Sequence, residues 1–338
     1  MQEEKKAETA TEIYLLPPTL TDVDINSTDF PEPRFVVPGL IPEGITILGG
    51  KPKIGKSLLG YSVAHSLATG YKVLGTIPVN QIEVLYLCLE ETPGRLKRKL
   101  SKMRGDALPT NRIHFAFKWP RIEDGGLEDL DRWIKTHPMV KLVVIDTFAR
   151  LRSLNSFHGG YATDYDEIGK IKTIADNNSV AIVVIHHLRK ASADDQIDLI
   201  TGSAGLTGAS DSILILKRQR MSSESVLFVA GRDIEEKNLA LKFDRSTCSW
   251  TMIGLAEEYR MSKERQEVVQ LLRDAQGPLK LKDIASALGK KEPVIHKHLS
   301  SLVEASLVEQ PGYGLYQIHK TSESGENGKG GESLQLIQ

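Results

Sequence analysis

The segment Gly50–Ser57 constrains the fold of this 338-residue chain most strongly, because it reads Gly-Lys-Pro-Lys-Ile-Gly-Lys-Ser. It follows the apolar run Ile45–Leu48, and apolar residues at helical spacing come after it. A strand, a glycine-rich loop and a helix in this order predict a phosphate-binding loop, in which backbone N–H groups and the helix N-terminus surround phosphate oxygens. Lys56 is predicted to contact the outer phosphates of ATP, and Ser57 to bind Mg²⁺. The predicted nucleotide-binding residues are Gly50, Lys51, Pro52, Lys53, Ile54, Gly55, Lys56, Ser57 and Leu58.

Composition and charge narrow the class of protein. The 43 Lys and Arg residues nearly balance the 44 Asp and Glu residues, which excludes the bulk basic character of a histone-like protein. Any contact with nucleic acid must therefore be local and directed at phosphates. The apolar runs are too short to cross a membrane and the N-terminus lacks the features of a signal peptide, so we expect a cytoplasmic protein without membrane contact. The two cysteines, Cys88 and Cys248, suggest neither a disulfide framework nor a thiolate zinc site.

The pattern of the chain predicts a large α/β core. Apolar runs at 84–89, 112–117, 142–145 and 181–185 alternate with helical stretches, which predicts a mostly parallel sheet with helices on both faces. Short strand-like runs between 212 and 253 predict an antiparallel extension of this sheet. Such sheets bind ligands at the carboxyl ends of their strands, where Gly49, Glu90, Asp146 and His187 all fall.

We predict five segments along the chain. Residues 1–32 form a flexible arm or subunit strap, because they are acidic, Thr-rich and end in a Pro-rich break. The core spans 33–256, a linker 257–261, a small C-terminal domain 262–320, and a Gly, Ser and Glu-rich disordered tail 321–338.

Two strand ends carry carboxylates suited to ATP chemistry. Asp146 ends the buried run Val143–Ile145, where it is predicted to hold Mg²⁺ through water. Glu90 is our candidate for the base that activates the attacking water. Glu91 is the rival, although it suits the start of the helix at Thr92-Pro93 better, and neighbours on a strand point to opposite faces.

The order of the motifs resembles a known group. They are 38–44 (PGLIPEG), 51–57 (KPKIGKS), 85–91 (LYLCLEE), 143–147 (VVIDT), 184–187 (VIHH), 202–205 (GSAG) and 231–233 (GRD). From about Pro33 to Gly254 the chain resembles the RecA-superfamily ATPases, and within them the RepA-type hexameric helicases of plasmids and related mobile elements.

This resemblance implies further site residues. His187 would sense the γ-phosphate, with His186 structural, and Arg232 would be an arginine finger that reaches a neighbouring subunit. Lys217, Arg218 and Arg220 are alternatives for the finger. Two loops would line a ring channel and grip single-stranded DNA: the first is 150–161, after the Asp146 strand, and the second is 188–203, after the His187 strand. They carry the predicted DNA-binding residues Arg150, Arg152, Arg189 and Lys190, although Asp194, Asp195 and Asp198 make the second loop partly acidic.

The segment 262–320 has the pattern of a winged helix-turn-helix domain. Three helical stretches are followed by a hairpin pattern at 307–318 with a Gly-rich tip. Exposed residues of the third helix and its turn would enter a major groove; they are Lys290, Lys291, His296, Lys297 and His298. Nine Lys and Arg against seven Asp and Glu leave both duplex DNA and a replication protein as possible partners. We interpret another basic run, 95–104, as a solvated helix face rather than a DNA site.

The sequence therefore predicts an ATP- and Mg²⁺-dependent DNA motor, a replicative-type helicase that forms a homo-oligomeric, hexameric ring. The alternative is an ATP-switched DNA-binding regulator or recombination accessory ATPase that does not unwind DNA.

Overall fold

The computed structural model describes residues 19–30, 32–154, 160–188, 204–218, 224–275, 277–305 and 307–318. The chain divides into two compact units, residues 1–34 and 35–338. In the first unit, α1 (Asp22–Ser27) is one short helix whose residues are all exposed. The side chains of Thr21 and Asp24 each accept a hydrogen bond from the other's backbone N–H, which satisfies donors that the helix start leaves unpaired.

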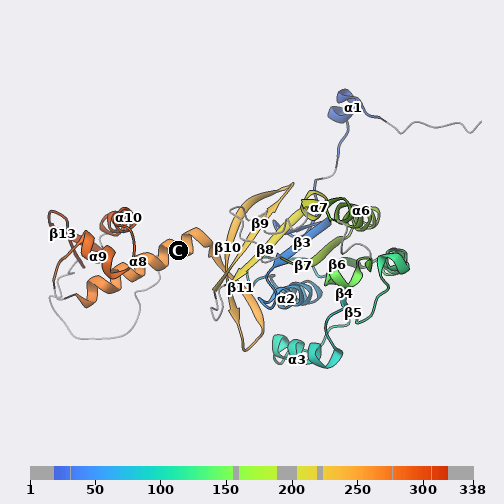
Figure 1. Ribbon diagram of the computed structural model, residues 1–338, viewed down its shortest axis with the longest axis horizontal. Helices are drawn as coiled ribbons and strands as arrows, with labels where there is room; N and C mark the ends of the chain where they lie inside the picture. Colours follow the sequence, from blue (N-terminus) through green and yellow to red (C-terminus); the bar gives the residue numbers. More distant parts are fainter. Residues whose placement is uncertain are drawn as a thin grey trace, which may run out of the picture. The chain divides into compact units, whose positions relative to one another are not determined.

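The second unit contains a nine-stranded sheet in the order β11-β10-β9-β8-β3-β7-β6-β4-β5 (Figure 1). The parallel strands are β3 (Gly44–Gly50), β4 (Glu83–Cys88), β5 (Ile113–Ala116), β6 (Val140–Asp146), β7 (Ala181–His187) and β8 (Ser212–Arg218). The antiparallel strands are β9 (Glu224–Gly231), β10 (Ile234–Asp244) and β11 (Ser249–Leu255). A mostly parallel sheet with an antiparallel extension confirms the predicted fold class.

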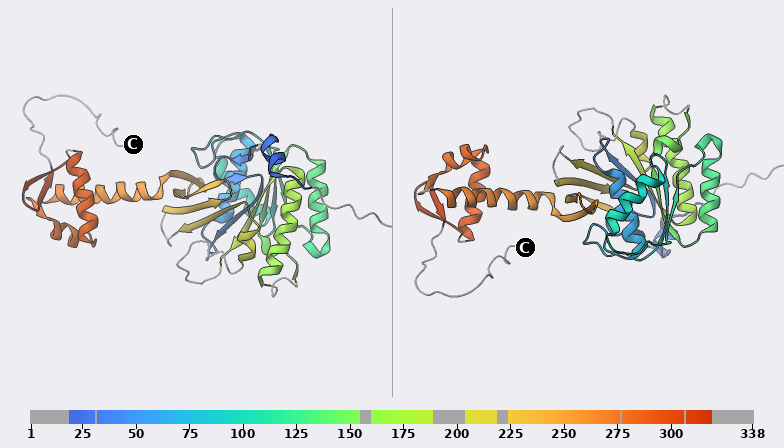
Figure 2. Two further views of the ribbon diagram at one scale, coloured as in Figure 1. Left: turned by 90° about the horizontal axis from the view of Figure 1, so that it is seen from above. Right: turned by 90° about the horizontal axis from the view of Figure 1, so that it is seen from below.

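Helices cover both faces of this sheet (Figure 2). One apolar layer joins α2 (Lys56–Thr69) and α3 (Pro93–Arg104) to the sheet, and contains Leu59, Leu67, Leu96 and Tyr86. The other joins α4 (Gly126–Thr136), α5 (Phe148–Leu151) and α6 (Gly160–Asn178) to the opposite face. Successive strand residues alternate between the layers, which is the period of a pleated strand buried on both sides.

Smaller elements complete the core. The short strands β1 (Phe35–Val37) and β2 (Ile41–Pro42) pair with each other, η1 (Ile122–Asp124) precedes α4, and α7 (Ala204–Gly208) precedes β8.

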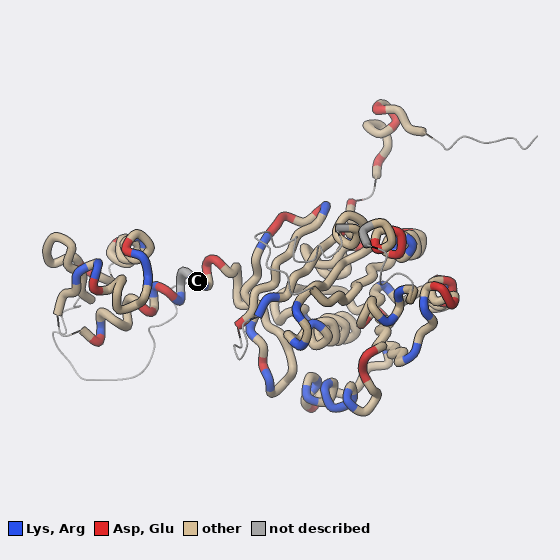
Figure 3. The backbone as a smooth tube through the Cα atoms, in the orientation of Figure 1, with Lys and Arg blue, Asp and Glu red and all other residues tan. Residues whose placement is uncertain are grey.

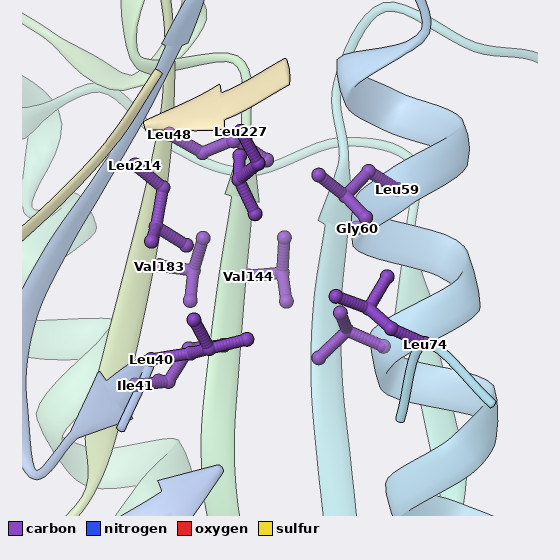
Figure 4. Close-up of a pocket in the computed structure, with 11 residues that line it drawn as sticks. Leu40, Ile41, Leu48, Leu59, Gly60, Leu74, Val144, Val183, Leu214 and Leu227 are labelled. Atoms are coloured by element: carbon purple, nitrogen blue, oxygen red, sulfur yellow. The ribbon is translucent and has the colours of Figure 1, made fainter. Parts of the chain in front are cut away.

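A small cavity of about 20 Å³ lies between α2 and the sheet (Figure 4). Leu48, Leu59, Val144 and Leu214 are among the residues that line it, and the lining exposes no polar surface. An apolar space of this size belongs to the packing of the core and offers a polar ligand no partner.

The C-terminal domain has its own core, which includes Val268, Leu272, Ile284, Leu299 and Tyr316. Its elements are α8 (Ala256–Asp274), β12 (Leu279–Lys280), α9 (Leu281–Ala287), α10 (Glu292–Glu304), β13 (Val308–Gly312) and β14 (Leu315–Ile318). The last two strands form a hairpin that pairs with β12, so the domain is a winged helix-turn-helix, as predicted.

The segment 257–261 differs from its prediction as a linker. These residues form the first turns of α8, which runs without a break into the C-terminal domain. Near its start, Tyr259 and Lys263 both hydrogen-bond to Glu224 of β9, at 3.2 and 3.1 Å. None of the helices in the described parts of the chain is long and apolar enough to cross a lipid bilayer.

Candidate active site

The phosphate-binding loop leaves the centre of the sheet, because Gly50 pairs with His187 of β7 on one side and Leu216 of β8 on the other. A Cβ at Gly50 would lie 2.9 Å from the carbonyl oxygen of Leu216, so the close strand spacing requires glycine there. Gly55 has a φ of +110° at the start of α2, and a Cβ there would lie 2.9 Å from the Trp250 ring. The two glycines of the motif are therefore required by backbone geometry.

Lys56 is buried in this loop and its ammonium group has three close partners. Nζ donates to the carbonyl oxygens of Gly50 and Lys51 at 2.7 and 3.1 Å, and lies 2.9 Å from Nδ1 of His187. Burial lowers the pKa of Lys56 to about 8, although the charges of Asp146 and Glu90 act in the opposite direction. Lys56 is thus a desolvated cation held at the end of β3.

Asp146 lies at the end of β6 and is also buried. Tyr86 donates a hydrogen bond to Oδ2 at 3.1 Å. Burial raises the pKa of Asp146, whereas hydrogen bonds with Ser57 and Tyr86 lower it. The structure therefore brings Ser57 and Asp146, the two predicted magnesium-binding residues, into direct contact. A hydroxyl and a carboxylate suit Mg²⁺, which prefers oxygen ligands.

Glu90 lies in the turn that follows β4, because this strand ends at Cys88. Its Oε1 accepts a hydrogen bond from Thr147 at 3.0 Å. Its Oε2 lies 3.8 Å from Nε2 of His187, and Arg150 Nε lies 3.8 Å from Oε1. Glu90 thus connects the ends of β4, β6 and β7.

Glu91 points into different surroundings. It forms an ion pair with Lys99 of α3 and accepts a hydrogen bond from the backbone N–H of Thr92. Both glutamates lie beyond the strand, so the alternation of strand side chains is not what separates them. The cause is the turn at 89–92, which leaves Glu90 at the sheet edge and ties Glu91 to α3.

His187 stands between Lys56 and Glu90. Its pKa is lowered by burial and by the Lys56 charge, while Glu90 acts in the opposite direction. The imidazole is therefore neutral at pH 7, and Nδ1 accepts a hydrogen bond from the Lys56 ammonium group. His186 points elsewhere and lies near the Phe148 ring, with a pKa that burial lowers to about 4.

Arg152 does not fit its prediction as a DNA-binding residue. It is buried beneath the sheet edge, where it forms ion pairs with Asp164 and Glu167 of α6, and its guanidinium lies over the Phe148 ring. A cation held in this way cannot reach a DNA phosphate. Arg150 is exposed beside Glu90, whereas Arg189 and Lys190 lie outside the described residues.

Arg232 lies at the sheet edge opposite the phosphate-binding loop, because Gly231 pairs with the first residue of β8. It forms an ion pair with Asp211 at 3.3 Å. The alternatives Lys217 and Arg218 end β8 on the loop side, and the Arg218 guanidinium lies over the Phe243 and Trp250 rings. Arg220 lies outside the described residues.

Three contacting residues were not singled out from the sequence. Tyr86 and Thr147 lie inside the motifs at 85–91 and 143–147, so their positions offered a signal. Trp250 offered none, because it is nearly 200 residues from Gly55 in sequence and reaches it only through the pairing of β10 with β11.

In the C-terminal domain, Lys291, His296 and Lys297 are exposed at the start of α10, as predicted for a recognition helix. His298 is buried, with Nε2 2.8 Å from Glu264, so its prediction as an exposed residue is wrong. Helical periodicity turns position 298 toward α8. Lys290 donates to the same glutamate at 2.8 Å, which is the main cause of the lowered pKa of Glu264.

The loop, the strand-end carboxylates and the sheet order define a P-loop ATPase domain with a RecA-like fold, followed by a winged helix-turn-helix. A family model described as an AAA domain matches residues 10–193, more than half of the chain. The chain belongs to this family. A second model, described as a bacterial regulatory protein of the arsR family, matches residues 262–310.

Solved structures with similarity to the chain include two at low sequence identity. A KaiC-like protein from Pyrococcus horikoshii OT3 is 14% identical with a TM-score of 0.44, over 65% of this chain and 99% of that one. A RadB recombinase is 17% identical with a TM-score of 0.43, over 61% of this chain and 90% of that one. A search of curated protein sequences found no match.

Proposed function

We propose that this chain is an ATP-hydrolysing DNA motor that works as a homo-oligomeric ring, with six subunits as the expected number. The observation that carries the proposal is the row Lys56–His187–Glu90. His187 contacts the phosphate-binding lysine through one ring nitrogen and faces the candidate base through the other. A change at the phosphates would therefore reach the end of β7, where the chain continues toward the second predicted DNA loop.

The site suits a magnesium-bound nucleoside triphosphate. The loop 50–57 and the start of α2 would surround the phosphates, and Ser57 and Asp146 would hold Mg²⁺, Asp146 through water. Mg²⁺ would neutralise charge on the phosphate oxygens. Lys56 would exchange its bonds to the Gly50 and Lys51 carbonyls for a γ-phosphate oxygen, since an ammonium group gains more from an anion than from carbonyl groups.

Glu90 would take the proton of the attacking water. Its Oε1 already accepts a hydrogen bond from Thr147, which fixes the carboxylate and leaves Oε2 to accept the proton. His187 faces that oxygen through Nε2, which carries the ring proton, while its Nδ1 lone pair accepts the hydrogen bond from Lys56. The imidazole therefore has no free lone pair with which to compete for the proton of the water. In this proposal Lys56 compensates the negative charge of the γ-phosphate, and Glu90 acts as the base.

DNA contact is assigned to two places. Arg150 is exposed beside Glu90 and would grip a single strand in the ring channel, together with Arg189 and Lys190. The exposed residues Lys291 and Lys297 on and before α10 would contact duplex DNA, or else a replication protein. Helicase activity is the specific form of motor that we propose.

An ATP-switched DNA-binding regulator is the second candidate. It is favoured by the similarity of residues 262–310 to a family of bacterial regulatory proteins and by the burial of Arg152, which removes one cation from the proposed channel. In this case hydrolysis would change assembly or duplex affinity without strand separation.

The deciding experiment measures ATP hydrolysis by the full chain with and without single-stranded DNA, and unwinding of a forked duplex in the same buffer. Lys56→Ala is the inactive control, and Lys291→Ala/Lys297→Ala tests the winged helix. Stimulation by single strands with unwinding supports the motor. Hydrolysis that ignores single strands, with ATP-dependent duplex binding and no unwinding, supports the regulator.

A further inference from the structure

Helix α3 carries a concentration of positive charge that the ATPase chemistry does not use. Its twelve residues include six cations and no acidic residue, and the blue segments of basic residues recur along its backbone (Figure 3). The cations are Arg95, Lys97, Arg98, Lys99, Lys102 and Arg104. The apolar side of the helix, with Leu96, Leu100 and Met103, packs on the core layer that contains α2.

Most of this charge faces solvent without a carboxylate partner. Arg95, Lys97, Arg98 and Lys102 are exposed. Within the described residues, Lys99 is the one cation of α3 that forms an ion pair, with Glu91. Unpaired cations on one helix repel each other and destabilise it. A helix that needed only to be soluble would be more stable with cations and carboxylates mixed on its surface. An anionic partner removes that repulsion.

The exposed cations form a stripe with a useful spacing. At 100° per residue, Arg95, Arg98 and Lys102 lie within about 60° of one another around the helix axis. From Arg95 to Lys102 the stripe is roughly 10 Å long, and the same length of duplex axis carries about six phosphates over its two strands. The stripe thus presents three cations in a row to a regular array of anions.

The sequence alone favours a solvated face for this run, but the structure leaves most of its cations exposed and, among the described residues, unpaired. We therefore propose that the basic face of α3 binds the phosphate backbone of duplex DNA without regard to sequence. The face holds no aromatic side chain on which bases of a single strand would stack. Its apolar residues face the core layer, with Leu96 buried and Leu100 and Met103 partly buried, so they offer little surface for insertion into a membrane or for the apolar centre of a protein interface. Arginine and lysine without apolar anchors suit a uniform phosphate backbone best.

The position of α3 joins this surface to the ATPase site. The helix begins three residues after Glu90, and Lys99 holds Glu91 while the Thr92 N–H donates to the same carboxylate. A duplex that draws Lys99 or its neighbours outward therefore acts directly on the turn that carries Glu90. This coupling rests on the proposed ATPase function, whereas the duplex binding itself does not.

The test is the affinity of the full chain for a labelled random-sequence duplex, measured by fluorescence anisotropy from 0.05 to 0.3 M salt. The variant is Arg95→Ala/Arg98→Ala/Lys102→Ala. Its matched control, Arg132→Ala/Lys135→Ala/Lys170→Ala, removes the same charge from exposed positions of α4 and α6. Loss of three phosphate contacts lowers the slope of log affinity against log salt by about 2.7 and weakens binding on the order of a hundredfold at 0.1 M salt.

Three comparisons make the outcome decisive. Arg95→Lys/Arg98→Lys/Lys102→Arg should keep the salt slope, and circular dichroism with basal hydrolysis should show that all variants are folded. Equal slopes for the α3 variant and its control overturn the proposal. The proposal is also overturned, in favour of an acidic protein as partner, if the wild-type chain binds a polyglutamate peptide more tightly than the duplex and the α3 variant loses this peptide binding. If the wild-type chain and every variant lack hydrolysis while circular dichroism shows that they are folded, the ATPase function is defeated and the binding result stands.

Discussion

The ammonium nitrogen of Lys56 lies 2.9 Å from Nδ1 of His187, across the paired ends of β3 and β7. Gly50 and His187 are register partners, so the lysine six residues further on reaches back to the neighbouring strand. This contact links the phosphate-binding loop to the strand that leads into the second predicted DNA loop.

Nucleotide affinity should fall as pH rises above about 8. Burial lowers the pKa of Lys56 to about 8, so its positive charge is present below this pH and is lost above it. Affinity of a fluorescent ATP analogue should decrease roughly tenfold per pH unit between 8 and 10, as one linked proton requires. Lys56→Arg keeps its charge throughout this range. If both proteins show the same pH profile, Lys56 is not the titrating group.

Replacing His187 by Ala should make the rate of ATP hydrolysis independent of single-stranded DNA. Nucleotide binding should remain within a few-fold, since the Gly50 and Lys51 carbonyls still position Lys56 before the nucleotide arrives, whereas stimulation by single-stranded DNA should disappear. The measurement is the rate of ATP hydrolysis by wild type and by the variant, each with and without single-stranded DNA. Normal stimulation in the variant would restrict His187 to a structural role.

Glu90→Gln should retain ATP binding and slow hydrolysis by a factor on the order of 100 or more, because an amide cannot accept the proton of the attacking water. Glu91→Gln is the matched control, since it removes only the pairing with Lys99. Single-turnover hydrolysis separates chemistry from product release. The assignment is reversed if Glu91→Gln shows the larger loss.

Arg152→Ala should lower the free energy of unfolding by about 3 kcal/mol, because the buried carboxylates of Asp164 and Glu167 lose their cation. Arg150→Ala should change it by less than about 1 kcal/mol, since that side chain is exposed. Urea unfolding followed by circular dichroism compares them. Equal stability of the two variants would contradict the structural role of Arg152.

The trans-acting arginine can be tested by mixing. Variant subunits with Arg232→Ala or Arg218→Ala are added in increasing proportion to wild type. The finger is the residue whose loss lowers ATPase activity more steeply than the fraction of variant, because each such subunit inactivates the site of a neighbour. A linear decline for Arg232 would remove it from that role. Arg232 would then be a residue that forms an ion pair with Asp211 of its own subunit.

The local sequence pattern was sufficient to predict much of the fold of this protein. The strand, loop and helix around Gly50–Ser57, the alternation of apolar runs and the helix spacing of 262–305 all depend on neighbours in sequence. These features predicted a mostly parallel sheet and a winged helix-turn-helix, and both are confirmed. The sequence also predicts Asp146, Glu90 and His187 at one edge of the sheet, because the carboxyl ends of parallel strands share an edge.

Contacts between distant segments were decided only by the tertiary structure. Arg150 and Arg152 are cations two residues apart in sequence, yet only Arg152 contacts Asp164 and Glu167, and burial with them excludes it from DNA. Trp250 meets Gly55 only through the pairing of β10 and β11. Sequence spacing determines which face of its own element a residue occupies, but not which element packs against that face, because that choice depends on the energy of the whole packed core.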